Sequence, residues 1–305
     1  MAAEAALAIP SPAPRFDRRF LLTGALLACA CGAARVGRAA GASGVIGYVD
    51  GVVPADAPEG TFVIERGDGS VERRVAARMV LRVDDRIAIA PGGVLRLGLL
   101  DRSLELTGPR AATPVDGVTI VAPPDSPVAE ALILAAPSAA DRAVKRGRNM
   151  GRLSLPLVPP SGGSLLAGLR PLSLGWYGGA PPYEVTLLPA EGEAALFAES
   201  GLGEPVLPPR SLGMAPGSYR LTIADSRQDK ISRKLEVVPE AAEPRMPVDK
   251  VPAGVAAEIR TMARAQWLSQ QDDGRWRLQA YLALRELPDA FPLGRSLARR
   301  LETDG

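Results

Sequence analysis

The stretch Leu81–Leu106, LRVDDRIAIAPGGVLRLGLLDRSLEL, decides the fold of the N-terminal half of the chain. Three short apolar-alternating runs lie within it, and Pro91-Gly92-Gly93 and Asp101-Arg102 separate them. Alternation with a period of two places every second side chain on one face of a strand, whereas Gly, Pro and Asp favour turns. The stretch therefore predicts antiparallel strands joined by tight turns.

Three more apolar runs precede this stretch: Val45–Val49, Thr61–Glu65 and Val71–Ala76. The segment Arg66–Ser70 joins the second run to the third. Its Asp68-Gly69 pair is a strong hairpin signal, because glycine accepts the positive φ that a tight turn demands. Arg66-Gly67-Asp68 also spells an integrin-binding tripeptide, but a hairpin turn is the preferred interpretation. We expect an antiparallel all-β domain over residues 44–122.

The turn chemistry of this domain resembles that of the FecR family. In that family a leucine, a Gly-Asp turn and an isoleucine precede one strand, and Asp-Gly-Ser opens another. Leu81, Asp84-Asp85 and Ile87 form the first motif here, and Asp101-Arg102-Ser103 forms the second. An aspartate and an arginine replace the two glycines. The resemblance implies a periplasmic β-domain, and some members of the family relay an outer-membrane signal to a sigma factor.

Residues 1–43 have the pattern of an export segment. Arg18-Arg19 precedes an apolar run from Phe20 to Ala34, which is shorter than the roughly 20 residues of a membrane-spanning helix. A basic flank, a short apolar run and small residues are typical of a signal peptide, and the arginine pair resembles a twin-arginine signal. Three outcomes stay open: lipidation of Cys29, cleavage near Ala39–Ala42, or retention as an anchor.

Composition argues against most site chemistry. The 305 residues contain no histidine, which removes the commonest general base and metal ligand. The two cysteines, Cys29 and Cys31, both lie in the N-terminal segment, so no disulfide or thiolate site is expected beyond them. The net charge is +2, without the strongly basic balance that nucleic-acid binding usually requires. We predict no metal, no cofactor and no nucleic-acid partner.

Catalytic motifs do not occur in the sequence either. Dinucleotide-binding, P-loop, nucleophile-elbow and Ser-x-x-Lys patterns are all missing. The acidic pairs Asp84-Asp85 and Asp272-Asp273 are adjacent in sequence, so their side chains point apart. We interpret them as turn or cap residues rather than as the paired carboxylates of a glycosidase. The protein is therefore predicted not to be an enzyme and to have no catalytic residue.

Residues 123–152 break the strand pattern. Three prolines and an Ala/Leu-rich stretch over 128–136 are followed by a basic run, which comprises Arg142, Lys145, Arg146, Arg148 and Arg152. We interpret the segment as a solvated linker or the face of a short helix. The alternative is contact of the basic run with anionic lipid or with lipopolysaccharide phosphates.

A second β-domain is expected over residues 153–239. About seven short apolar runs fit there, which suggests an immunoglobulin-like sandwich. Trp176 is expected to fill the space between the sheets. Pro216–Tyr219 resembles the segment of fibronectin-type sandwiches in which a tyrosine hydroxyl binds upstream backbone. In the less favoured alternative, Trp176, Tyr177 and Tyr183 line a carbohydrate-binding surface.

Residues 240–251 are predicted to be a linker and residues 252–303 a helical tail. Three apolar stripes have helical spacing: Val255 to Trp267, Trp276 to Leu287, and Leu293 to Leu301. Asp272-Asp273-Gly274 and Pro288 separate them. The tail resembles one tetratricopeptide-like helical hairpin with an extra helix. A single repeat cannot build a solenoid, so we expect the tail to dock on the second β-domain or on a partner.

The predicted fold is mainly β, with a FecR-like antiparallel domain, an immunoglobulin-like sandwich and a small C-terminal helical hairpin. We expect a non-catalytic protein of the bacterial periplasm or cell envelope that acts as an interaction, scaffold or ligand-binding module for a protein partner. Membrane association would run through the N-terminal segment. The alternative is a signal-transduction component that regulates a membrane partner or a sigma factor. Residues 1–19 are short for a sigma-factor-binding domain, which weakens the sigma-factor form of that alternative.

Overall fold

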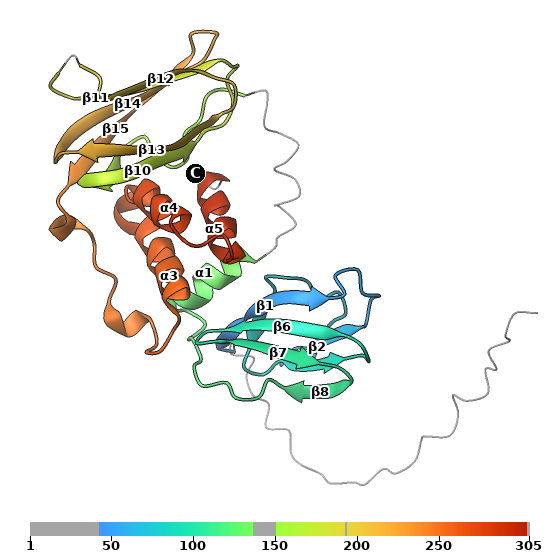
Figure 1. Cartoon of the computed structure of the whole chain (residues 1–305). Coiled ribbons are helices and arrows are strands. Elements are labelled where there is room, and N and C mark those ends of the chain that lie inside the picture. The colour runs from blue at the N-terminus through green and yellow to red at the C-terminus, as the bar shows by residue number, and fades with distance from the viewer. Residues whose placement is uncertain (1–42, 137–150, 193, 304–305) are drawn as a thin grey trace, which may run out of the picture. The chain divides into compact units, whose positions relative to one another are not determined.

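The computed structural model describes residues 43–136, 151–192 and 194–303 (Figure 1). Within these ranges the chain is mainly β, as predicted, with two groups of strands and four α-helices. Cys29, the export segment and the basic residues 142–148 lie outside the described ranges. Among the described helices, none has both the length and the apolar character needed to cross a membrane.

The first group of strands forms two four-stranded antiparallel sheets. One sheet has the order β4-β1-β6-β7 and the other the order β3-β2-β5-β8. The strands are β1 (Val45–Val53), β2 (Phe62–Glu65), β3 (Val71–Glu72), β4 (Val80–Arg82), β5 (Arg86–Ile89), β6 (Val94–Leu99), β7 (Ser103–Thr107) and β8 (Arg110–Pro114). We call this unit the first sandwich.

Alternating apolar side chains build the core of the first sandwich. In β6, Leu95 and Leu97 are fully buried, and Arg96 between them is exposed. In β5, Ile87 and Ile89 are buried in the same way. These side chains belong to one apolar cluster that both sheets share. The period-two pattern of the sequence therefore identified the buried face correctly.

The hairpin between β2 and β3 forms as predicted. The Arg66 N–H donates to the Ser70 carbonyl at 2.8 Å, and the Gly69 N–H donates to the Arg66 carbonyl at 2.9 Å. Gly69 has a φ of +87°, which is the left-handed region where glycine carries no steric cost. The Asp68 carboxylate accepts hydrogen bonds from the backbone and the hydroxyl of Ser70. Within this fold the Arg-Gly-Asp tripeptide is part of a hairpin turn.

The second group of strands forms a five-stranded sheet, β12-β11-β14-β15-β9, and a two-stranded sheet, β10-β13. The strands are β9 (Gly163–Leu166), β10 (Gly168–Gly175), β11 (Tyr183–Pro189), β12 (Phe197–Leu202), β13 (Val206–Met214), β14 (Gly217–Ala224) and β15 (Lys230–Val238). The adjacent β11, β14 and β15 correspond to strands C, F and G of the immunoglobulin fold, and β10 with β13 corresponds to B with E. We call this unit the second sandwich.

Two aromatic side chains take the positions predicted for them. Trp176 is 1% exposed and lies in the core, where its ring meets the Tyr183 ring edge-on with 5.3 Å between centroids. The Tyr219 hydroxyl donates to the backbone carbonyl of Ala215 at 2.9 Å. This bond is the tyrosine corner of immunoglobulin-like sandwiches, and it ties the start of β14 to the preceding turn.

The helical tail follows the three predicted stripes. It consists of α3 (Ala257–Ser269), α4 (Arg277–Arg285) and α5 (Pro292–Thr303), preceded by the short 3-10 turns η3 (Glu240–Ala242) and η4 (Val248–Lys250). The predicted stripe residues Ile259, Met262, Ala280, Leu284, Leu293 and Leu297 are buried. The connection between α3 and α4 is the 3-10 segment η5 (Gln271–Gly274).

Part of the segment 123–152, which the sequence indicated as a solvated linker or the face of a short helix, is helical. Residues 127–135 form the helix α1 (Pro127–Ala135). The Ser126 hydroxyl caps it by accepting the Ala129 N–H, and Pro127 stands in the first turn, where its missing N–H costs nothing. Val128 and Leu132 are fully buried, and α1 packs against α3 and α5.

The helical tail docks on the second sandwich, as expected. One side of β9 pairs in parallel with β15, and its other side faces the tail. There the Ser164 N–H donates to the Arg275 carbonyl at 2.6 Å, and the Leu166 N–H donates to Oε1 of Gln279 at 3.2 Å. The tail therefore supplies hydrogen-bond acceptors to a sheet edge that would otherwise have open backbone donors.

Replacing Tyr219 by Phe removes the tyrosine-corner hydrogen bond and leaves the ring in place. We expect the free energy of unfolding to fall by about 1 kcal/mol, because a net intramolecular hydrogen bond contributes about that much. Chemical denaturation of the full chain measures the change. An unchanged free energy of unfolding would show that the hydroxyl does not stabilise the sandwich.

Candidate functional site

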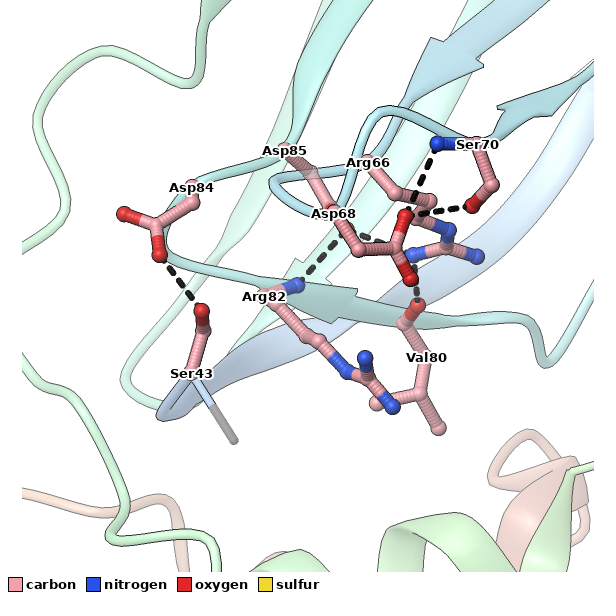
Figure 2. A network of polar contacts seen from close by, with 8 residues as sticks. All are labelled: Ser43, Arg66, Asp68, Ser70, Val80, Arg82, Asp84 and Asp85. Atoms are coloured by element: carbon pink, nitrogen blue, oxygen red, sulfur yellow. Dashed lines mark hydrogen bonds and ion pairs between the residues drawn. The ribbon is translucent and has the colours of Figure 1, made fainter. Parts of the chain in front are cut away.

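The adjacent carboxylates of Asp84 and Asp85 point apart, as the sequence indicates (Figure 2). Asp84 is exposed and accepts a hydrogen bond from the Ser43 hydroxyl. Asp85 is fully buried. Its Oδ2 accepts from the Arg66 guanidinium at 2.6 Å and from the Arg82 N–H at 2.8 Å. The two carboxylates therefore do not act on a common atom.

The contacts of Asp85 hold together the turns of the first sandwich. Arg66 comes from the β2 end of the hairpin and also donates to the Val80 carbonyl of β4 at 2.9 Å. Asp85 itself follows β4 and precedes β5. One buried ion pair thus connects segments from both sheets (Figure 2). Asp85 therefore has a structural role in this fold.

The second acidic pair forms a tight turn between α3 and α4. Asp272 and Asp273 have φ values of +50° and +57°, and Gly274 follows with +81°. Three successive left-handed residues reverse the chain sharply, and aspartate tolerates this region better than most side chains. Oδ2 of Asp272 accepts the indole N–H of Trp276 at 3.0 Å. Asp272 therefore stabilises the turn, which agrees with its interpretation as a turn residue.

The aromatic residues do not form the carbohydrate-binding surface that the alternative required. Trp176 and Tyr183 are buried, at 1% and 4% exposure, so their faces are not available to a sugar. The Tyr183 hydroxyl donates to the Gly178 carbonyl at 3.2 Å. Burial, followed by the charge of Asp225, raises the pKa of this phenol. These rings belong to the core of the second sandwich.

Asp225 is a structural carboxylate that sequence analysis did not identify. It lies in the turn after β14 and is 3% exposed. One oxygen accepts the Ala180 N–H, and the other accepts the N–H groups of Arg227 and Asp229, all at 2.9 Å. An aspartate that opens the turn between two strands is the signal that could have indicated it.

A pocket of about 380 Å³ lies at the helical tail. The ends of α1, α3 and α5 and the start of α4 contribute to its wall. The residues used below are Leu134, Gln266, Asp273, Arg277, Arg300 and Leu301. We call this the tail pocket. Its volume falls in the range of small-molecule sites, which is about 300–1,000 Å³.

Gln266 is the most informative residue of the tail pocket. Its side chain is buried, at 4% residue exposure. Nε2 donates to the Glu130 carboxylate at 3.2 Å, and Gln270 donates to the same carboxylate oxygen at 2.5 Å. Oε1 of Gln266 is buried and accepts no hydrogen bond from the described residues. This oxygen has essentially no exposed surface, so it is an unsatisfied acceptor within the helix packing and is not presented to a ligand.

Charge in the tail pocket is mixed but positive in balance. Arg277 and Arg300 contribute two guanidinium groups and Asp273 contributes one carboxylate. Arg277 also reaches the Pro156 carbonyl at 3.4 Å, which fixes its position near the second sandwich. The positive end of the α4 helix dipole lies at the same place. The wall therefore carries charges of both signs.

Sequence analysis did not find this pocket, although one signal was present. Gln266 falls on the apolar stripe of α3, four residues after Met262 and seven after Ile259. A polar residue on the buried face of a helix requires a partner. Its neighbours in the pocket come from helices far apart in the sequence, so no local motif combines them. Among the described residues, no three His, Cys, Asp or Glu side chains gather as a metal site would require.

Comparisons with known proteins do not assign a family. No family model matches the chain, and no curated protein matches it. Among solved structures, the crystal structure of CopC from Methylosinus trichosporium OB3b aligns with 28% of this chain and 88% of its own length. The identity is 17% and the TM-score is 0.19. The FecR-like resemblance stays a prediction from turn motifs.

Replacing Asp85 by Ala breaks a buried ion pair and leaves the Arg66 charge without its partner. We expect the free energy of unfolding to fall by about 3 kcal/mol. The matched control is Asp84→Ala at the exposed neighbouring position, where a change within about 0.5 kcal/mol is expected. Denaturant titration of both variants measures the difference. Equal losses in the two variants would contradict a special role for the buried carboxylate.

Asp225 gives the protein a stability that depends on pH. Burial alone would raise the pKa of its carboxyl, but three backbone N–H groups and Arg227 outweigh burial and hold the pKa below its ordinary value. The stabilisation is therefore present above about pH 4, where an unfolded aspartate is ionised, and is lost as the pH falls through the folded pKa.

The corresponding variant is Asp225→Asn. It should unfold at lower denaturant concentration than the wild type at pH 7, and the difference should shrink as the pH falls below about 4. Denaturation midpoints at pH 7, 5, 4 and 3 test this. A difference that stays constant over this range would exclude ionisation of Asp225 as the cause.

Proposed function

We propose that this protein is a non-catalytic binding module of the bacterial cell envelope, and that it holds a ligand or a group of a partner in the tail pocket. The observation that carries the proposal is the tail pocket itself, a cavity of about 380 Å³ that polar, charged and apolar side chains of four helices line. Its volume is that of a small-molecule site. Packed helix ends give the pocket a rigid wall, which is suited to binding.

The structural roles of the two buried carboxylates support the non-catalytic part of the proposal. Asp85 binds Arg66 and backbone, and Asp225 binds three backbone N–H groups. A general acid or base must reach the proton that it transfers. These two groups are instead engaged in holding turns, which favours a binding role over a catalytic one.

The envelope part of the proposal is supported by the sequence of residues 1–43. A basic flank and a short apolar run are typical of exported proteins. The FecR-like turn motifs implied the same compartment. The immunoglobulin-like strand order of the second sandwich is compatible with this location, because such sandwiches are common in cell-surface proteins.

Fractionation of the bacterium that produces this protein tests the location. We expect the chain in the periplasmic or membrane fraction, with an N-terminus at a lipid-modified Cys29 or near Ala42, because the apolar run is too short for a stable span. Intact-mass measurement identifies the N-terminus. A full-length chain in the membrane would instead favour a signalling component, and a cytosolic chain would contradict the proposal.

Native mass spectrometry of the same purified chain tests the binding role. We expect an added mass on the wild type that is lost in Gln266→Met, which removes a polar side chain of the pocket wall and its contact with Glu130. The matched control is Arg299→Gln, an exposed position on α5 beside the pocket residue Arg300. The control should keep the added mass. An added mass that persists in Gln266→Met, or that never appears, would count against the tail pocket as the binding site.

A further inference from the structure

We propose that the first sandwich has a binding site of its own, for a short aliphatic carboxylate. The site is a groove of about 310 Å³ between the loop that follows β1 and the segment that follows β3. We call it the sandwich groove. The lining residues used below are Val52, Glu59, Phe62, Arg73, Arg74 and Val75. This site does not involve the tail pocket and does not depend on its function.

The floor of the sandwich groove is apolar. Phe62 of β2 is 4% exposed and belongs to the core of the first sandwich. Val52 of β1 and Val75 are half-buried and pack against the same core. The groove is therefore a place where the apolar interior reaches the surface, and a hydrocarbon chain bound there would be removed from water.

The volume of the groove limits the length of that hydrocarbon chain. A cavity of about 150 Å³ holds benzene, which has six carbon atoms. The sandwich groove, with about 310 Å³, therefore has room for a chain of about eight carbon atoms. A longer acyl chain would extend into solvent and gain little from its outer methylene groups.

The charges at the groove favour one anionic group on the ligand. Arg74 forms an ion pair with Glu59, with 3.4 Å between Nε and Oε2. The guanidinium of Arg73 is exposed and makes no hydrogen bond or ion pair with the described residues. Asp56, in the loop after β1, does not line the groove. One positive charge is therefore left for a ligand carboxylate, which a guanidinium binds through charge-assisted hydrogen bonds.

The walls of the groove are held in place by the protein itself. The Gly60 N–H donates to the Arg73 carbonyl at 3.1 Å, which joins the two segments at one end. The Glu72 carboxylate accepts the Arg74 N–H at 3.2 Å, which fixes the start of the segment after β3. A preformed wall reduces the ordering cost of binding.

Calorimetric titration of the full chain with three probes tests the proposal. The probes are octanoate, octanamide and butanoate, each below the concentration at which it aggregates. We expect octanoate to bind about fivefold more tightly than octanamide, because only octanoate forms the ion pair with Arg73. Octanoate should bind at least tenfold more tightly than butanoate, because it buries more methylene groups.

Two variants separate the charge from the apolar floor. In Arg73→Gln the preference for octanoate over octanamide should disappear. In Val75→Thr, which keeps the shape of the side chain but adds a hydroxyl, the preference for octanoate over butanoate should shrink. The matched control is Arg86→Gln, at an exposed position of β5 outside the groove, which should keep both preferences.

Each preference is a ratio within one variant, so a general loss of stability does not imitate the result. Melting curves show whether each variant is folded. Equal binding of octanoate and octanamide, or no binding of any probe, would overturn the ligand class. Displacement of octanoate by inorganic phosphate would do the same, because it would indicate a simple anion site. Octanoate binding that is lost in Gln266→Met but unchanged in Arg73→Gln and Val75→Thr would place the ligand in the tail pocket and overturn the sandwich groove.

Discussion

Two backbone N–H groups at one sheet edge set the position of the helical tail. Ser164 and Leu166 on β9 donate to Arg275 and Gln279 of the tail rather than to another strand. A buried donor without an acceptor costs about 1–3 kcal/mol, so docking of the tail stabilises this edge of the second sandwich. Once the start of α4 is fixed there, α3 and α5 pack around it and α1 closes the bundle. The tail pocket is the space that this packing leaves.

Local motifs in the sequence predicted those parts of the fold that a few neighbouring residues determine. The Asp68-Gly69 hairpin, the Tyr219 corner and the three tail helices all follow from turn chemistry or periodicity, and each is present. The strand β8 was missed, and the helix α1 lies in a segment for which a linker and a short helix were both left open. The strand has little alternation, and the helix is a short, uniformly apolar run that periodicity alone does not assign.

The candidate site could not be predicted from the sequence, for a different reason. Its wall brings together residues of four helices, and a one-dimensional pattern does not say which helices become neighbours. Gln266 was visible only as a polar residue on an apolar stripe. The acidic pairs that did attract attention are turn residues: the Asp85 carboxylate accepts a backbone N–H, and the Asp272 carboxylate accepts the indole N–H of Trp276. The acidic pairs, which are conspicuous in the sequence, form turns, whereas the inconspicuous Gln266 lines the pocket.

The parallel pairing of β9 with β15 has a consequence for the order in which the chain acquires structure. The first strand of the second sandwich, β9, pairs with the last strand, β15. Most of that domain must therefore be synthesised before β9 has a partner. The other edge of β9 gains its partners later still, because Arg275 and Gln279 follow β15 in the chain. Such high contact order slows folding and prolongs the exposure of an open strand. A nascent chain that stalls before the tail would therefore expose the unpaired edge of β9, which is prone to aggregation. Chaperone contact is most useful at that stage.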